Sequence, residues 1–355
     1  MRSWIPLCTL ALAGALLGGA CAPSAKTEDT TGTGTGAVAT TPDTNLTGDI
    51  KIDGSSTVYP IVEAFASKDG FGNIAPNVKT VVNQAGTGAG MEMFARGEID
   101  IATASRPIKD KEIEALKKAG IEFIEVPIAF DGLTVVVNKE NTWAKSMTID
   151  DLKKVWHKDS KITNWKDINP AFPDQKLVLC GPTDAHGTYE YFNETVNGGT
   201  DQGRQDYNQF PEYSSMVPAV TGDKGALGYL GLAYYEENKD SLNVIAIDGG
   251  NGPVTPDNAT VQDGTYSPLS RPLLIYINKK SLDEKPEVKA FVKFAMEGGS
   301  GLVKDTGFVA LPADIYAKAW ERVEKGITGA VFNTFKPGMS MADALSSGAA
   351  ATATK

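Results

Sequence analysis

The strongest constraint on the fold of this chain is a regular alternation of short β-branched runs with helical patterns. The alternation starts near residue 50 and continues to about residue 126. Strands that are each followed by a helix predict a mostly parallel sheet with helices on both faces. The expected strands cover residues 50–52, 78–83, 99–103 and 121–126, and the expected helices cover 57–68, 91–96 and 110–119.

Two further apolar strands, 132–138 and 271–278, lie more than a hundred residues apart with a second α/β stretch between them. That stretch predicts helices near 149–155, 188–196 and 232–238 and strands near 176–179 and 242–247, and the second apolar strand is followed by expected helices at 286–296 and 314–325. A domain inserted into another through two extended crossovers places the ligand site in the cleft between the domains. The crossovers then form the hinge.

This plan resembles that of the type II periplasmic binding proteins. We therefore expect an α/β chain with two α/β domains joined by two hinge crossovers. Domain I is expected to be discontinuous and to contain residues 47–137 and 270–345, domain II to contain 138–269, and residues 346–355 to form a flexible tail.

The N-terminus predicts export. Residues 1–20 read as a secretory signal, because their apolar run is too short to span a membrane and ends in small residues. Cys21 follows these small residues as in a bacterial lipobox, with Gly18 where that motif usually has Leu, so Cys21 is expected to be lipidated. Ordinary signal cleavage, which releases a soluble protein, is the alternative. Residues 21–46 are rich in Thr, Gly and Ala and are expected to be a disordered tether to a membrane, in the periplasm or at the cell surface.

The composition argues against several classes of function. There are 44 acidic and 34 basic residues, a net charge of −10, and nucleic-acid binding depends on an excess of Lys and Arg. Two histidines and Cys180, which reads as a small buried hydrophobe, do not make a set of metal ligands. The chain has no P-loop and no complete dinucleotide-binding fingerprint. No metal and no cofactor are expected.

Three short segments rich in Ser, Thr and Gly are each placed between a β-branched run and a helical pattern. They are residues 53–60 (DGSSTVYP), 85–90 (AGTGAG) and 184–189 (DAHGTY). The start of a helix carries unpaired backbone N–H groups and the positive end of the helix dipole, and Gly lets a ligand approach that backbone closely. Hydroxyl groups add further donors, so the three segments together predict an anion site.

Five ordered motifs resemble the PstS family, the substrate-binding proteins of the phosphate ABC importer. They are residues 54–60 (GSSTVYP), 97–108 (GEIDIATASRPI), 130–138 (FDGLTVVVN), 222–229 (GDKGALGY) and 307–312 (GFVALP). The resemblance implies a monomeric, non-catalytic receptor that binds inorganic phosphate and delivers it to membrane permease subunits by hinge closure.

The resemblance also implies which residues contact phosphate. The family motifs carry over to Ser56 and Thr57 at the first helix start, to Thr87 in the glycine loop and to Ser105. The loop that ends in Gly187 and Thr188 supplies further donors and departs from the family, because His186 stands where Ser is usual. The resemblance makes Arg204 the expected charge partner of the anion. Arg106 is the second candidate, although a structural ion pair is its more expected role.

Selection of phosphate over sulfate needs an acceptor for the proton that phosphate carries. Facing sulfate, a buried carboxylate is left unpaired, which costs about 1–3 kcal/mol or more. Some relatives carry this carboxylate directly after the Ala-Ser pair, where this chain has Arg106. Asp131, on the cleft side of the first crossover, is the expected substitute, and a turn-forming role before Gly132 is its alternative.

Three other functions remain open from the sequence alone. The same fold could bind another oxyanion, such as arsenate, sulfate or molybdate, with His186 as the reason. A secreted phosphatase could use His186 or Asp131 as its nucleophile, although no nucleophile motif accompanies them. A surface adhesin or scaffold would bind no such ligand.

Overall fold

The computed structural model describes residues 42–184, 186–333 and 341–352 of the chain, the last six without their side chains. The expected signal peptide, Cys21 and most of the expected tether therefore lie outside the described residues. The end of the expected tether lies against the body, because the backbone N–H of Asp43 donates to the carbonyl of Ile74 over 2.7 Å.

The N-terminal part of the sheet is built as the alternation predicts. β1 (Gly48–Gly54) lies between β2 (Val78–Val82) and β3 (Ile101–Ala104), parallel to both. The helices of this part are α1 (Tyr59–Ala66), α2 (Phe71–Ile74), α3 (Thr87–Ala95) and α4 (Asp110–Ala119). Because parallel strands share one carboxyl edge, the loops after β1, β2 and β3 meet there.

The centre of the sheet differs from the expectation of a mostly parallel arrangement. β4 (Phe123–Asn138) is one strand of 16 buried residues, where two separate strands at 121–126 and 132–138 were expected. It runs antiparallel to β12 (Ser270–Asn278), and the register shifts by one residue between Leu273 and Leu274. Pro127 lies beside this bulge, which lets the strand continue through a residue that has no N–H to donate.

β4 changes partner along its length. Residues up to Gly132 pair with β12, whereas residues from Leu133 onward pair antiparallel with β8 (Ala226–Gly231) and near the end with β9 (Leu242–Val244). Beyond β8 the sheet is parallel again, through β6 (Val178–Pro182) and β7 (Asn208–Phe210). A small separate sheet contains β5 (Ser146–Thr148), β10 (Ala246–Asp248) and β11 (Pro253–Val254).

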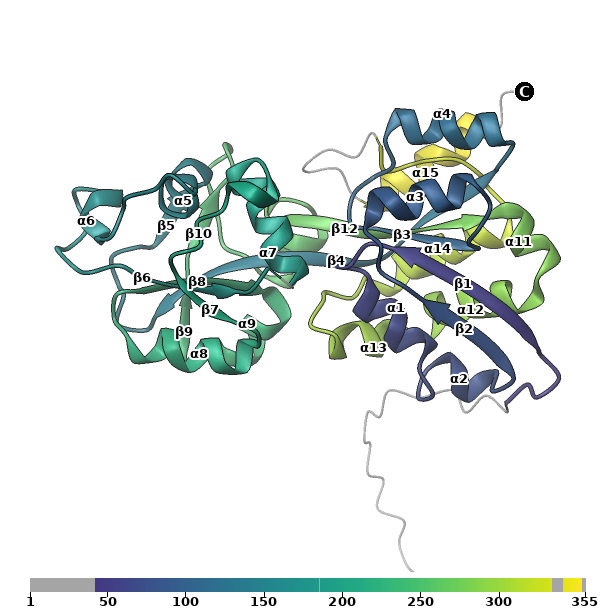
Figure 1. Cartoon of the computed structure of the whole chain (residues 1–355), viewed down its shortest axis with the longest axis horizontal. Helices are drawn as coiled ribbons and strands as arrows, with labels where there is room; N and C mark the ends of the chain where they lie inside the picture. The colour runs from purple at the N-terminus through teal and green to yellow at the C-terminus, as the bar shows by residue number, and fades with distance from the viewer. Residues whose placement is uncertain (1–41, 185, 334–340, 353–355) are drawn as a thin grey trace, which may run out of the picture. The chain divides into compact units, whose positions relative to one another are not determined.

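Two lobes therefore lie on either side of the point where β4 changes partner (Figure 1). The second lobe also contains α5 (Ile149–Trp156), α6 (Trp165–Ile168), α7 (Gly187–Phe192), the π-helical turn η1 (Asn193–Asn197), the 3-10 turn η2 (Thr200–Gln202), α8 (Tyr213–Gly222), α9 (Leu232–Asn238) and α10 (Asn258–Gln262). After β12 the chain returns to the first lobe with α11 (Lys279–Glu284), α12 (Pro286–Glu297), α13 (Ser300–Asp305), α14 (Ala313–Glu324) and α15 (Met341–Thr352).

The expected class, two α/β lobes joined by two crossover strands, is confirmed, and the exact domain boundaries remain a prediction. The tail expected from residue 346 is helical as far as Thr352. Among the residues that the structure describes, no helix has both the length and the apolar character needed to cross a membrane.

Glycine brings the loop after β1 into close contact with its neighbours. Gly54 has a φ of +138°, and a Cβ there would lie 2.2 Å from the carbonyl oxygen of Thr103. A Cβ on Gly90, in α3, would lie 2.5 Å from the Cα of Gly54. Only glycine allows both approaches. The turn that carries Ser56 and Thr57 begins directly after this contact.

We predict that Gly54→Ala lowers the free energy of unfolding by at least roughly 1–3 kcal/mol, because alanine meets both an unfavourable backbone conformation and the Thr103 carbonyl. Gly301→Ala is the matched control, since Gly301 lies in α13 with open space around it and alanine there favours the helix. Urea unfolding curves of the two variants measure the difference. Equal curves would contradict the strain at Gly54.

Candidate functional site

A cleft of about 460 Å³ contains most of the residues expected at the site. Its walls come from the turn before α1, from β4, from the starts of α7 and α8, from α9 and from the segment after α13. Of the expected residues, it is lined by Ser56, Thr57, Asp131, His186, Gly187 and Thr188. The structure thus brings together segments of both lobes that are more than a hundred residues apart in the sequence.

The two lobes touch directly at this cleft. A Cβ on Gly187, at the start of α7, would lie 2.7 Å from Oγ1 of Thr57 and 3.0 Å from its Cα. Beside this contact, the hydroxyl of Ser56 donates to Oε2 of Glu190 over 3.2 Å. Gly187 therefore allows an approach of the lobes that any larger residue would prevent.

Asp131 forms an ion pair at the floor of the cleft. It faces Arg271 across the antiparallel strands β4 and β12, where the two residues are direct partners in the register. Nε and Nη2 of Arg271 both lie 3.2 Å from Oδ2 of Asp131, and Nη2 also donates to Oγ1 of Thr57 over 3.3 Å. Burial raises the pKa of the Asp131 carboxyl above its ordinary value, and the charge and hydrogen bond of Arg271 oppose that rise.

One donor and one acceptor of this pair remain available. Among the described residues, neither Nη1 of Arg271 nor Oδ1 of Asp131 has a hydrogen-bond partner. Phosphate that carries a proton offers the matching groups, an oxygen that accepts and a hydroxyl that donates. Arg271 does not itself line this cleft, but it bonds two of the residues that do, Asp131 and Thr57.

Sequence reasoning missed Arg271. Of the arginines in the described part of the chain, it alone hydrogen-bonds a residue that lines the cleft. The available signal was an arginine at the start of an apolar crossover strand. Its use depends on the register with Asp131, 140 positions away, which no local pattern shows.

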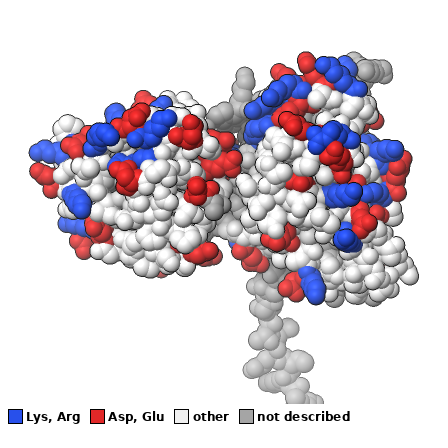
Figure 2. Space-filling model, viewed as in Figure 1, with Lys and Arg blue, Asp and Glu red and all other residues white. Residues whose placement is uncertain are grey.

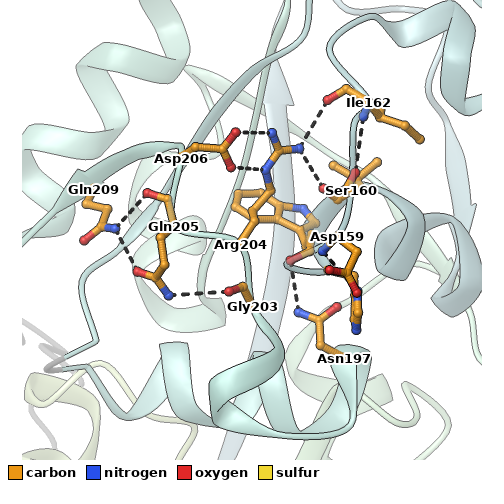
Figure 3. Close-up of polar contacts among 12 residues, drawn as sticks. Asp159, Ser160, Ile162, Asn197, Gly203, Arg204, Gln205, Asp206 and Gln209 are labelled. Atoms are coloured by element: carbon orange, nitrogen blue, oxygen red, sulfur yellow. Dashed lines mark hydrogen bonds and ion pairs between the residues drawn. The ribbon is translucent and has the colours of Figure 1, made fainter.

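Arg204, the expected charge partner of the anion, does not line the cleft, and its contact with phosphate stays a prediction. Its side chain is buried away from the cleft, and its guanidinium is occupied by the Asp206 carboxylate at 2.7 and 2.9 Å and by the carbonyls of Val155 and Ile162 (Figure 3). This arginine connects α5 and the following loop to the segment before β7. Its donors are therefore used within the second lobe.

Arg106 takes the structural role that was the more expected one. Its guanidinium pairs with both carboxylate oxygens of Glu112 at 2.9 and 2.7 Å and also donates to the carbonyl of Pro107. Glu112 in turn accepts from the backbone of Lys109 at the start of α4. This network fixes the chain between β3 and α4.

Thr87 and Ser105 lie outside the cleft wall. The hydroxyls of the two residues are 3.4 Å apart, and the backbone N–H of Ser105 is 3.4 Å from Oγ1 of Thr87. They meet at the carboxyl edge of β1, β2 and β3, as the parallel strands require, but they contact each other there. Their expected contact with phosphate remains a prediction.

His186 is held by the segment that leads from β7 into α8. Its Nε2 lies 2.6 Å from the carbonyl oxygen of Pro211, an acceptor, so this nitrogen carries a proton. Its ring lies 5.1 Å from the ring of Tyr213, whose hydroxyl donates to Oγ1 of Thr188 over 2.6 Å. The imidazole therefore has only Nδ1 available for a ligand. Its Nε2 is bonded to the Pro211 carbonyl and anchors the start of α7.

The mouth of the cleft adds residues that the motifs did not indicate. They include Lys304, Glu212, Tyr234 and Glu237. Lys304 is exposed at the end of α13 and is a second cation near the site.

Comparison of the sequence with known proteins identifies the family of this chain. Residues 26–297 match the PBP superfamily domain. The protein SphX of Synechococcus elongatus is 42% identical over 80% of this chain and 83% of its own length, and the phosphate-binding protein PstS of Staphylococcus haemolyticus is 39% identical over 79% and 87%. The chain belongs to the PstS family.

A solved structure extends the match to the fold. A possible phosphate binding protein from Planctomyces limnophilus has a TM-score of 0.75 and 40% identity, over 79% of this chain and 99% of that chain. The two-lobed arrangement and the cleft described above are thus those of a PstS-family chain. The membership agrees with the interpretation of the five sequence motifs.

The raised pKa of Asp131 predicts a pH-dependent stability. Between the ordinary aspartate pKa and the raised value, the native protein binds more protons than the unfolded chain, so this contribution falls as pH rises. The unfolding free energy of the wild type minus that of Asp131→Asn should therefore increase as pH is lowered from neutral, and level off below the ordinary value. Chemical denaturation of the ligand-free proteins measures it.

Asp206→Asn provides a control of opposite sign. The hydrogen bond from Arg204 lowers the pKa of Asp206, so its contribution is present above the ordinary value and is lost as pH falls. A difference curve for Asp131→Asn that runs in the same direction as that of Asp206→Asn would contradict the assignment.

Proposed function

We propose that this chain is an extracytoplasmic, high-affinity receptor for inorganic phosphate that delivers its ligand to an ABC importer by hinge closure. The observation that carries the proposal is the pair formed by Asp131 and Arg271 across the two crossover strands, in contact with Thr57 of the cleft. Membership of the PstS family supports it.

The chemistry of the pair favours phosphate over sulfate. Arg271 supplies positive charge and fixed N–H donors, which suit a tetrahedral oxyanion. Asp131 supplies a buried acceptor for the ligand's proton, and sulfate has no proton to offer at neutral pH. The discrimination is then the cost of an unpaired buried carboxylate, about 1–3 kcal/mol or more.

The affinity must come from local groups. Figure 2 shows acidic and basic side chains interspersed over both lobes on the face in view, and the chain as a whole carries a net charge of −10. Long-range attraction of an anion is weak under these conditions. The ion pair, the hydroxyl of Thr57 and the start of α7 with Gly187 and Thr188 act at short range, in the cleft.

Delivery requires partners and a location. In this proposal, the permease subunits of a phosphate importer accept the ligand, and the monomeric receptor is held in the periplasm or at the cell surface by a lipid on Cys21. No catalytic activity is assigned to it.

Calorimetric titration of the ligand-stripped protein with phosphate, sulfate and arsenate tests this function. We expect tight binding of phosphate and much weaker binding of sulfate. In Asp131→Asn, the difference between the two binding free energies should shrink by about 1–3 kcal/mol. Preferential binding of sulfate, or no heat with any of the oxyanions, would contradict the proposal.

The two arginines give a matched pair of variants. Arg271→Gln removes the charge at the cleft and should weaken phosphate binding by roughly 2–5 kcal/mol. Arg204→Gln removes a buried guanidinium of the second lobe and should lower the melting temperature without changing the affinity of the folded protein. Loss of binding in Arg204→Gln with normal binding in Arg271→Gln would restore the interpretation made from the sequence.

A further inference from the structure

Arg271 is covered on one side by an aromatic ring from the second lobe. The carbon of its guanidinium lies 3.7 Å from the centre of the Tyr191 ring, which is a stacking distance. Tyr191 belongs to α7 and is 5% exposed. Its hydroxyl donates to the carbonyl of Pro268 over 2.7 Å, just before β12 begins. The ring is thus fixed at both ends.

A stacked guanidinium has few orientations left. Its donors all lie in one plane, so a ring that covers its face holds that plane and limits the directions in which the donors point, without using any of them. In this orientation, both Nε and Nη2 of Arg271 approach the same oxygen of Asp131, Oδ2. Without the ring, the guanidinium could rotate into the more favourable fork, with one nitrogen on each carboxylate oxygen.

That rotation would change what the site offers to a ligand. The fork would occupy Oδ1 of Asp131, the acceptor that distinguishes a protonated oxyanion from an unprotonated one. It would also neutralise the two charges more completely. The ring therefore preserves the free acceptor of the pair.

We infer that Tyr191 is a positioning residue that sets the phosphate specificity of the cleft by holding Arg271 on one oxygen of Asp131. This inference rests on the proposed function. Tyr191 does not line the cleft, and it acts on the ligand through Arg271 alone.

Two variants separate the ring of Tyr191 from its hydroxyl, and a third variant is the control. Tyr191→Phe keeps the ring and loses the hydroxyl, and should bind phosphate within about threefold of the wild type, because stacking is retained. Tyr191→Leu loses the ring and should bind phosphate roughly 10- to 30-fold more weakly, with a smaller ratio of phosphate to sulfate affinity. Tyr189→Leu is the control, since Tyr189 is a buried tyrosine of the same helix whose hydroxyl contacts Thr200 and Gln205.

The affinity ratio is the readout that a purely structural role would not change. Calorimetry with phosphate and sulfate gives the ratio, and thermal unfolding without ligand gives the stability of each variant. Tyr189→Leu should lower stability and leave the ratio unchanged. In an Arg271→Gln background, Tyr191→Leu should have no further effect on binding, because there is no cation left to position.

If Tyr191→Leu does not fold, ring fluorination at the same position replaces it. Successive fluorine atoms on a phenylalanine at position 191 withdraw electron density from the ring face and keep its shape, so phosphate affinity should fall step by step. An unchanged ratio in Tyr191→Leu, equal losses in Tyr191→Phe and Tyr191→Leu, or no trend with fluorination would overturn the inference. Failure of the wild type itself to bind phosphate would instead overturn the proposed function.

Discussion

The site depends on the register of two antiparallel strands. β4 and β12 connect the lobes, and their pairing brings Asp131 and Arg271 opposite each other close to Gly132, the last residue of β4 that pairs with β12. A shift of one residue would turn one of the two side chains to the opposite face of the sheet. The charge pair and the connection between the lobes are therefore one structural feature. Its buried setting is what raises the pKa of Asp131.

The architecture was largely accessible from the sequence, because it rests on local periodicity. The bounds expected for two helices, 110–119 and 232–238, are those observed for α4 and α9. The centre of the sheet was not accessible in the same way. Strand direction there depends on pairing between β4 and β12, and the continuity of β4 through Pro127 depends on a bulge that only the paired strands reveal.

The cleft residues divide in the same way, into those with a local sequence signal and those whose position depends on long-range packing. Residues in loops that follow strands, such as Ser56, Thr57 and Gly187, were predictable because Ser, Thr and Gly at a helix start have a local meaning. The arginine was not, since one guanidinium is chemically like another. Arg204 and Arg271 differ only in what surrounds them: a carboxylate and two carbonyls of one lobe for Arg204, and two residues that line the cleft, Asp131 and Thr57, for Arg271. A family motif indicates which residue types meet, whereas the packing of the chain decides which of several arginines lies beside the cleft residues.

The partner exchange of β4 has a mechanical consequence. The lobes are joined by a paired ribbon and not by two independent loops, so relative motion between them must bend or twist a hydrogen-bonded ladder. The stiffness of such a paired ribbon limits how far the two lobes can move relative to each other, and its elastic restoring force opposes that motion. Ligand capture and release then cost elastic deformation of one continuous strand, with no segment needing to unfold.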